Sequence, residues 1–269
     1  MNALEIRGLT KRRGDFALQG LDLTLPAGCI MGLIGENGAG KSTTIRLILN
    51  GLRRDGGTTR AMTALDREDI GVVLDEGGLP EYMNAQQIGR MMAGIFTRWQ
   101  PEAYRGYLRR LALPEDKPFR DFSRGMKMKL GLAAALSHQP KLLLLDEATS
   151  GLDPVVRDEI LTIFADFTRD EEHAVLISSH IVSDLEKICD YIAFLHKGRL
   201  LLCEEKDRLT EEYGILRGDT DGIAPAAVCG RHATPYGTEY LVRRSAVPAG
   251  MALGQVSIEE LFVFMAKEV

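Results

Sequence analysis

The sequence predicts an α/β fold in which buried parallel strands alternate with helices around a phosphate-binding loop. An apolar run at 30–34 leads directly into a glycine-rich segment, 35–43, that fits the pattern G-x-x-x-x-G-K-[ST]. Two later apolar runs, 142–145 and 174–178, have the composition of strands buried on both faces of a sheet. Between them Pro154 suits the first turn of a helix. Strand, loop and helix therefore recur in the order that an α/β core requires.

The segment 35–43 predicts a site for nucleotide phosphates. Glycines let the backbone curl so that its N–H groups face phosphate oxygens, and the helix expected at 43–49 adds a partial positive charge. Lys41 is expected to neutralise the β- and γ-phosphates, and the Ser42 hydroxyl to bind Mg²⁺. A glycine-rich turn without a ligand fits less well, because both flanking elements are in place. The predicted binding residues are Gly35, Glu36, Asn37, Gly38, Ala39, Gly40, Lys41, Ser42 and Thr43.

The segments before and after this loop differ in hydrophobic period. The first thirty residues alternate with the period of a strand, which predicts an antiparallel layer beside the core; the positions are Leu4, Ile6, Leu21, Leu23 and Leu25. From 84 to 113 the spacing becomes helical, at Ile88, Met91, Met92, Ile95 and Phe96 and again from Tyr104 to Leu111. This helical block indicates a subdomain inserted at about 80–137.

The second half of the chain returns to alternating strand and helix. We expect a short helix at 181–189 and a hairpin at 191–202, which turns at Lys197-Gly198. Capping-box spacing at 257–260 predicts the start of a final helix. The sequence thus predicts a nucleotide-binding domain at 1–206 and a small C-terminal α/β appendage at 207–269.

Composition narrows the class of protein. The chain carries 38 acidic and 33 basic residues, a net charge of −5 with no basic stripe, which argues against nucleic acid as a partner. Its four cysteines form no C-x-x-C pair, so a reducing cytosol fits better than a disulfide or zinc scaffold. The first residues do not resemble a signal peptide, and no apolar run approaches the roughly 18 residues that span a bilayer. If the protein works at a membrane, another chain must provide the membrane-spanning segments.

An acidic pair follows the apolar run 142–145. The end of a parallel strand places such side chains beside the phosphate loop, so Asp146 is expected to hold Mg²⁺, through water, and Glu147 to polarise the attacking water. Phosphoryl transfer needs this arrangement because most of its barrier is charge placement and alignment. Two solvated acids at a strand end remain the alternative.

Three further segments complete a pattern, namely 121–126, 150–153 and 178–180. In order and spacing, the motifs between 30 and 200 resemble those of the ATP-binding subunit of an ABC transporter, a P-loop NTPase. The resemblance implies ATP and Mg²⁺ as cofactors, Lys41 in the Walker A loop, Glu147 as catalytic glutamate and His180 as the switch histidine at the γ-phosphate. It also implies a homo- or heterodimer of such subunits, in which Ser123 and the Gly125 amide bind ATP held by the other protomer. For Ser123 an ordinary helix cap is compatible with that role.

Two departures from the family pattern concern the helical subdomain. Arg124 and Met126 stand where the signature motif has its first glycine and its glutamine. The family usually has another glutamine where a strand enters this subdomain, and here the sequence reads Asp75-Glu76. We expect Asp75 to be the matched position, where its carboxylate could bind Mg²⁺ through water but could not donate as an amide does.

A third departure concerns the adenine ring. The aromatic residue that stacks on it in the family is absent from the segment Lys11-Arg12-Arg13-Gly14. Arg13 could stack through a cation–π contact, Phe16 could substitute, or the arginines could form a solvated cluster. From Arg13 we expect weak discrimination between ATP and GTP.

The pattern is similar to a branch of the family with separate transmembrane permease subunits, which often exports antibiotics, peptides or other amphipathic compounds. The expected place of work is the cytoplasmic face of the cell membrane. Leu79, Tyr82 and Met83, within 77–84, are the expected exposed residues for docking a permease. An importer, a non-transport ABC-type ATPase and a regulatory nucleotide-binding module are the alternatives.

Overall fold

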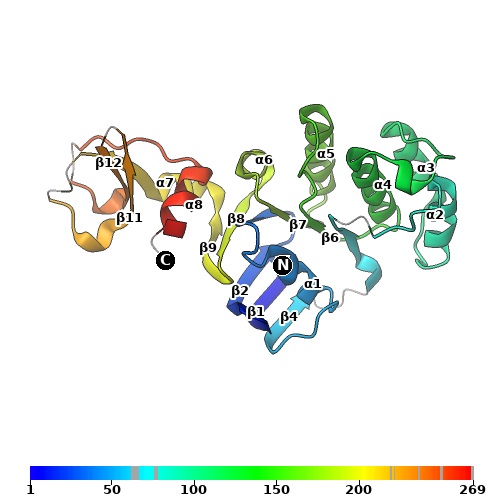
Figure 1. Cartoon of the computed structure of the whole chain (residues 1–269), viewed down its shortest axis with the longest axis horizontal. Coiled ribbons are helices and arrows are strands. Elements are labelled where there is room, and N and C mark those ends of the chain that lie inside the picture. Colours follow the sequence, from blue (N-terminus) through cyan, green and yellow to red (C-terminus); the bar gives the residue numbers. More distant parts are fainter. Residues whose placement is uncertain are drawn as a thin grey trace.

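The computed structural model describes residues 1–61, 67–75, 78–218, 220, 222–235, 237–248 and 251–267. The chain forms an elongated molecule with a sheet-containing core in the middle (Figure 1). A group of helices lies at one end, and a small sheet with two helices lies at the other.

A six-stranded sheet forms the centre of the core, in the order β5-β6-β7-β3-β8-β9. The first five strands are parallel, and β9 runs antiparallel to β8. Their bounds are β3 Ile30–Ile34, β5 Ile70–Val73, β6 Leu142–Asp146, β7 Ala174–Ser179, β8 Tyr191–His196 and β9 Arg199–Glu205. The predicted α/β class is confirmed. Because β3, β6 and β7 are parallel neighbours, the segments that follow them meet at one edge of the sheet.

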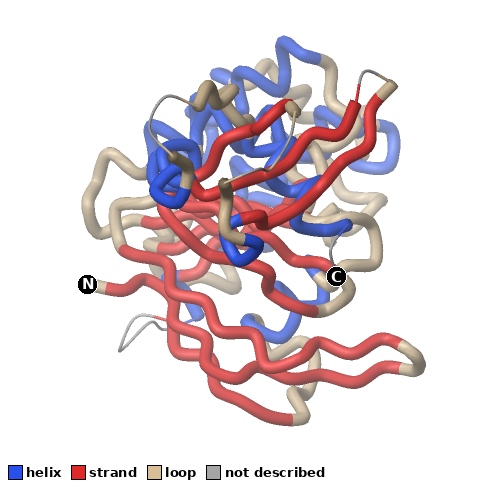
Figure 2. Tube along the Cα trace, turned by 90° about the vertical axis from the view of Figure 1, so that its left-hand side faces the viewer, coloured by secondary structure: helices blue, strands red, loops and turns tan. Residues whose placement is uncertain are grey.

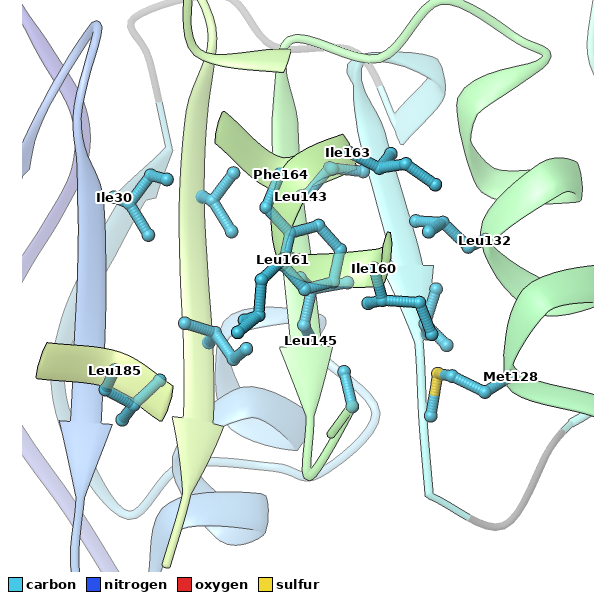
Figure 3. Close-up of a cluster of buried hydrophobic side chains, with 14 of the residues drawn as sticks. Ile30, Met128, Leu132, Leu143, Leu145, Ile160, Leu161, Ile163, Phe164 and Leu185 are labelled. Carbon is cyan, nitrogen blue, oxygen red and sulfur yellow. The ribbon is translucent and has the colours of Figure 1, made fainter. Parts of the chain in front are cut away.

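Apolar side chains cover both faces of this sheet. On one face α5 (Pro154–Phe167) and α6 (Val182–Ile188) pack on β6, β7 and β3, with Phe164 and Leu185 fully buried (Figure 3). The other face lies on α1 (Lys41–Ile48) and on an antiparallel layer of three strands, in the order β2-β1-β4. These strands are β1 Asn2–Arg13, β2 Phe16–Pro26 and β4 Gly56–Ala61, as the alternating pattern predicted for the first two.

The helical block contains α2 (Ala85–Ala93), α3 (Pro101–Arg110) and α4 (Arg124–Leu136). Asn84 caps α2 in a capping box with Gln87. Within the helical block, α2 ends at Ala93 with Gly94 as its C-cap, and a new helix begins at Pro101. Ile95, expected on the apolar face, lies in this break and is 60% exposed.

The C-terminal part forms its own antiparallel sheet, in the order β10-β12-β11. Its elements are α7 Lys206–Glu212, β10 Tyr213–Arg217, β11 Val228–Thr234, β12 Gly237–Arg243 and α8 Ile258–Lys267. In the described ranges, short 3₁₀ turns lie at Arg67–Asp69, Phe119–Asp121, Pro225–Ala227 and Arg244–Ala246. The capping box predicted at 257–260 is present, with Ser257 and Glu260 bonded reciprocally. Figure 2, viewed from this end, shows the small sheet in front and the antiparallel layer of the core below.

The appendage packs on the core rather than standing apart from it. Helix α8 contacts α6, and the ring of Phe262 lies 5.2 Å from that of Phe194 on β8. Apolar residues of α8, among them Leu261 and Phe264, belong to the same buried cluster as the core strands. Whether 206 and 207 mark a domain boundary stays a prediction. In the described part of the chain, no helix has the length and apolar character needed to cross a membrane.

Candidate active site

The glycine-rich loop joins β3 to α1, as its sequence predicted. Gly40 precedes the first residue of α1 with φ at 111°, in a region that favours glycine. A Cβ added there would lie 2.7 Å from Cζ of Phe16, so this ring would have to shift to accommodate any other residue. The first turn of α1 contains no acidic residue, so its positive end is open to an anion.

Lys41 lies inside this loop and is 5% exposed. Its Nζ donates to the carbonyl oxygens of Gly35, at 2.7 Å, and Glu36, at 3.2 Å. The same Nζ lies 3.1 Å from Oε1 of Glu147. The ammonium is thus held by the loop carbonyls and by the predicted base.

Asp146 is the centre of a hydrogen-bond cluster at the end of β6. Its Oδ1 accepts from the Ser42 hydroxyl at 3.0 Å and from the Ser178 hydroxyl at 2.7 Å. The backbone N–H of Glu147 donates to Ser178 Oγ at 3.1 Å. The cluster joins the phosphate loop to two strands, and Asp146 is 3% exposed.

Glu147 connects the three predicted catalytic residues. Oε1 faces Lys41, and Oε2 lies 2.7 Å from Nδ1 of His180. The backbone at Glu147 has φ at 52°, which is uncommon for a residue with a side chain and aims the carboxylate into the site. The Glu147 side chain is 12% exposed, whereas that of His180 is 43% exposed. The histidine therefore approaches the base from the open side.

The oxygen donors of the site suit a small hard cation. Ser42 supplies a hydroxyl and Asp146 a carboxylate, and Mg²⁺ is usually held by one or two such groups together with water and phosphate oxygens. Within the described ranges, no group of three or more His, Cys, Asp or Glu side chains could hold a metal by itself. Asp75 instead accepts from Nη2 of Arg124 at 2.5 Å. Its role toward Mg²⁺ stays a prediction, and Glu76 lies outside the described residues.

The residues predicted to act on a second protomer lie at the start of α4. Ser123 caps this helix, and its Oγ accepts from the N–H of Met126 at 3.2 Å. Ser123 is exposed, and the first turn of α4 contains no acidic residue. Among the described residues, no hydrogen bond or ion pair connects Ser123 or Gly125 to the phosphate loop of the same chain.

The two candidates for stacking on adenine occupy different surroundings. They are paired across the hairpin between β1 and β2. Phe16 is half-buried against the phosphate loop, whereas Arg13 is exposed. The docking candidates also differ from the expectation that all three are exposed. Tyr82 is 77% exposed, but Leu79 and Met83 are half-buried and pack against the core cluster. Gly77, the first residue of that segment, lies outside the described residues.

Comparison with known proteins decides the family. The model of the ABC transporter family matches residues 18–150. The bacitracin transport ATP-binding protein BcrA of Enterococcus faecalis is 34% identical over 212 residues, which cover 74% of this chain and 68% of that protein. The chain belongs to the ABC transporter ATP-binding proteins.

Two other ABC transporter proteins agree with this assignment. The lantibiotic transport ATP-binding protein SrtF of Streptococcus pyogenes is 33% identical over 213 residues, covering 76% of this chain and 91% of that protein. A solved ATP-binding subunit of an ABC transporter is 26% identical, with a TM-score of 0.70 over 77% of this chain and 91% of that one. The resemblance predicted from the motifs is confirmed. The chain is a nucleotide-binding ABC ATPase subunit, of the family that hydrolyses ATP to power transport.

Sequence reasoning missed some contacts of this ABC ATPase site. The sequence motif predicts a role for His180 but none for Ser178, yet the Ser178 hydroxyl connects Asp146 to the Glu147 amide. The signal was available in principle, because in-register parallel pairing of β6 and β7 sets Asp146 opposite Ser178. The pairing of Arg124 with Asp75 was also missed, since the two were treated as separate departures.

Proposed function

We propose that this ABC ATPase subunit acts in a closed dimer that holds two ATP molecules, and that the dimer drives an exporter with separate transmembrane permease subunits. In this dimer the phosphate loop of each protomer binds ATP, and Ser123 and Gly125 of the other protomer cover its γ-phosphate. Nucleotides bound in this way belong to both chains, so a single protomer has an incomplete site.

One observation about Gly125 carries the dimer proposal. A Cβ added at Gly125 would meet only Val156 Cγ1 at 3.6 Å and Leu152 Cδ2 at 3.7 Å, both ordinary contacts. Its φ is not in the left-handed region. Glycine in a helix costs roughly 0.5–1 kcal/mol relative to alanine, yet nothing described within the chain requires it here. Gly106 of α3 is equally unhindered, so what distinguishes Gly125 is its place in the first turn of α4, beside the Ser123 cap, where an approaching phosphate would need the space.

Mg²⁺ is proposed to bind Ser42 and Asp146, with the nucleotide supplying further oxygens. The ion would neutralise charge on the β- and γ-phosphates. The hydroxyl of Ser178 already donates to Asp146 Oδ1, which fixes the carboxylate and leaves its other oxygen to accept from a metal-bound water.

The chemistry proposed for the remaining residues follows from their contacts. When the triphosphate binds, the Lys41 ammonium gives up its hydrogen bonds to the loop carbonyls and its ion pair with Glu147, and donates to phosphate oxygens instead. Glu147 is then able to accept a proton from the attacking water, while the ring N–H of His180 is donated either to this carboxylate, which it orients, or to the γ-phosphate. Asp75 is proposed to reach the same Mg²⁺ through water in the closed state.

The names of the relatives support a peptide or drug substrate. BcrA and SrtF are named for bacitracin and lantibiotic transport, and DrrA of Streptomyces peucetius for daunorubicin and doxorubicin resistance. We propose that the chain works at the cytoplasmic face of the membrane. Its permease would contact Tyr82, whose exposed ring lies under the Arg120 guanidinium at 5.1 Å.

The dimer is tested by two matched glycine-to-alanine variants. Gly125→Ala places a methyl group where the partner's nucleotide would lie. Gly106→Ala is the control: it adds a methyl group to α3 at a position where nothing lies within 4 Å. Both should leave thermal stability unchanged or slightly raised. Only Gly125→Ala should lower ATP turnover, by tenfold or more, on the order of 1.4 kcal/mol. Wild-type specific activity should rise with protein concentration.

Two results would count against this function. Turnover by Gly125→Ala that equals wild type and keeps the same dependence on concentration would remove α4 from the site. A flat dependence in a sample shown to be monomeric would contradict a shared site altogether.

A further inference from the structure

The two departures from the family pattern in the helical subdomain contact each other. Arg124 is the first residue of α4, and Asp75 follows β5 after Leu74. Nη2 of Arg124 donates to Oδ1 of Asp75 at 2.5 Å. An arginine in the place of the signature glycine thus meets an acid in the place of the glutamine.

The Arg124 guanidinium also lies on a third segment, the turn after β6. A Cβ added at Gly151 would be 2.6 Å from Arg124 Nη1, and Gly151 has φ at 67°. The guanidinium therefore fills the space that a side chain at this position would need. It connects the end of β5, the start of α4 and the turn that precedes α5.

Arg124 and Asp75 both line a cleft of about 390 Å³ between α4 and β5. Apolar packing holds the middle of α4 against β5, where a Cβ at Gly131 would be 3.3 Å from Val73 Cγ1. Lys127, the other basic residue in the cleft, lies 5.2 Å over the ring of Phe119. Of the two basic residues that line the cleft, Arg124 is the one whose described contacts include an ion pair with Asp75, just after β5.

We propose that Arg124 is a positioning residue for ATP-dependent dimer closure. Its pairing with Asp75 and its contact with Gly151 hold the first turn of α4, and with it Ser123, in the orientation that covers the partner's nucleotide. This inference rests on the proposed function. The pair already exists in the free chain, so it acts by preorganisation and not by making a new contact on closure.

The size of the effect follows from the exposure of the pair. The side chains of Arg124 and Asp75 are 50% and 43% exposed. Exposed ion pairs contribute about 0.2–1 kcal/mol and weaken as salt rises. Because a symmetric dimer contains two copies of the pair, its loss should raise the concentration for half-maximal dimerisation about two- to thirtyfold.

The experiment uses the full-length Glu147→Gln protein as the parent, which should keep an ATP-bound dimer for long enough to measure. Dimerisation with ATP and Mg²⁺ is followed by sedimentation across protein concentration, at about 50 mM and about 500 mM salt. The variants are Arg124→Ala, Asp75→Ala, both together, and the reversed pair Arg124→Asp with Asp75→Arg. Arg120→Ala is the control, because this exposed arginine ion-pairs with Asp121.

The expected result has four parts. Each single substitution weakens dimerisation by a similar factor, and the double substitution is no worse than either. The reversed pair recovers most of the loss. The differences from the parent shrink at high salt. The affinity of the monomer for a fluorescent ATP analogue, measured without Mg²⁺ so that the proposed contact of Asp75 with the metal plays no part, stays within about twofold of the parent, which is about 0.4 kcal/mol.

Other results would overturn the proposal in distinguishable ways. Additive single effects, or a loss with Arg124→Ala but none with Asp75→Ala, would mean that Arg124 acts without its partner, for example directly on the opposing nucleotide. Equal dimerisation of parent and variants would overturn the positioning role alone. Failure of the parent to dimerise with ATP would overturn the proposed function and this inference with it.

Discussion

Lys41 and Glu147 are ion-paired across the active site, with Nζ 3.1 Å from Oε1. The cation that binds phosphate and the predicted base therefore neutralise each other before the nucleotide arrives. Binding of ATP has to separate them, because the ammonium cannot serve the carboxylate and the triphosphate equally well.

This ion pair leads to a prediction for Glu147→Gln. Turnover should fall by roughly 10²- to 10⁴-fold, because the amide cannot accept the proton. Affinity of the monomer for ATP should be equal to wild type or higher, because Lys41 does not have to break an ion pair with residue 147 in order to bind phosphate. Isothermal titration and a phosphate-release assay measure the two effects. Glu172→Gln is the matched control, because Glu172 pairs with Lys141 at the opposite end of β6. Near-normal hydrolysis would remove Glu147 from the role of base.

A second prediction concerns Ser178. Ser178→Ala removes the donor to Asp146 Oδ1 and an acceptor of the Glu147 amide, so both acids lose an orienting contact. We expect a stability loss of about 0.5–1.5 kcal/mol together with a several-fold lower turnover. Ser137→Ala is the control. Ser137 is also fully buried, but its Oγ donates to Ala133 O, at the end of α4.

Urea unfolding and ATPase assays on both serine variants separate the two effects. Ser137→Ala should lose comparable stability and keep its turnover. Equal turnover of Ser178→Ala and Ser137→Ala, at equal stability, would show that the hydroxyl of Ser178 does not orient the site.

A third prediction concerns recognition of the base. We expect turnover with ATP and GTP to agree within about tenfold, because stacking tolerates any base that offers a π face. Phe16→Ala should raise KM for both nucleotides by about fivefold or more, equivalent to at least 1 kcal/mol. Arg13→Ala on the same hairpin provides the comparison. A preference for ATP of about a hundredfold would contradict weak discrimination.

A fourth prediction concerns pH and His138. The ring stacks on Phe96 at 4.0 Å and is almost fully buried, and its Nδ1 lies 2.9 Å from Glu68 O. Burial lowers the pKa of His138 below its usual value of 6.5. Below that pH the unfolded chain binds a proton that the folded chain does not. Stability contributed by the neutral ring is therefore fully present above about pH 6.5 and is lost progressively as the pH falls from there through the lower pKa of the folded chain.

The difference in unfolding free energy between wild type and His138→Gln tests this effect. It should be largest near pH 7.5 and shrink toward pH 5.5. Carboxylates that titrate in the same range are common to both proteins and cancel. A difference that stays constant over this range would show that His138 is not the titrating group.

Local chemistry allowed much of the fold to be predicted. Continuous apolar runs such as 142–145 identify strands covered on both faces. Pro154 and Ser257 mark helix starts through their own backbone and side-chain preferences. Helical boundaries are less certain: the apolar spacing at 88–96 runs past the end of α2, whose C-cap is Gly94, and Pro101 opens the next helix.

The candidate site divides in a similar way. Strand order and loop motif bring Lys41, Asp146 and Glu147 to one edge of the sheet, and the sequence anticipated this. Contacts between segments far apart in the chain could not be anticipated, because they depend on how the helical block lies on the sheet. Arg124 and Asp75, 49 positions apart, are the clearest case. Each alone looked like a weakened motif, and only the fold shows them together.

The edge-to-face contact between Phe194 and Phe262 has a practical consequence for expression work. A truncated protein ending near residue 206 would keep every ATPase motif, but it would lack the apolar side chains of α8 that pack on β8. Such a fragment would expose aromatic side chains to solvent and tend to aggregate. Binding assays are therefore better run on all 269 residues than on a trimmed cassette.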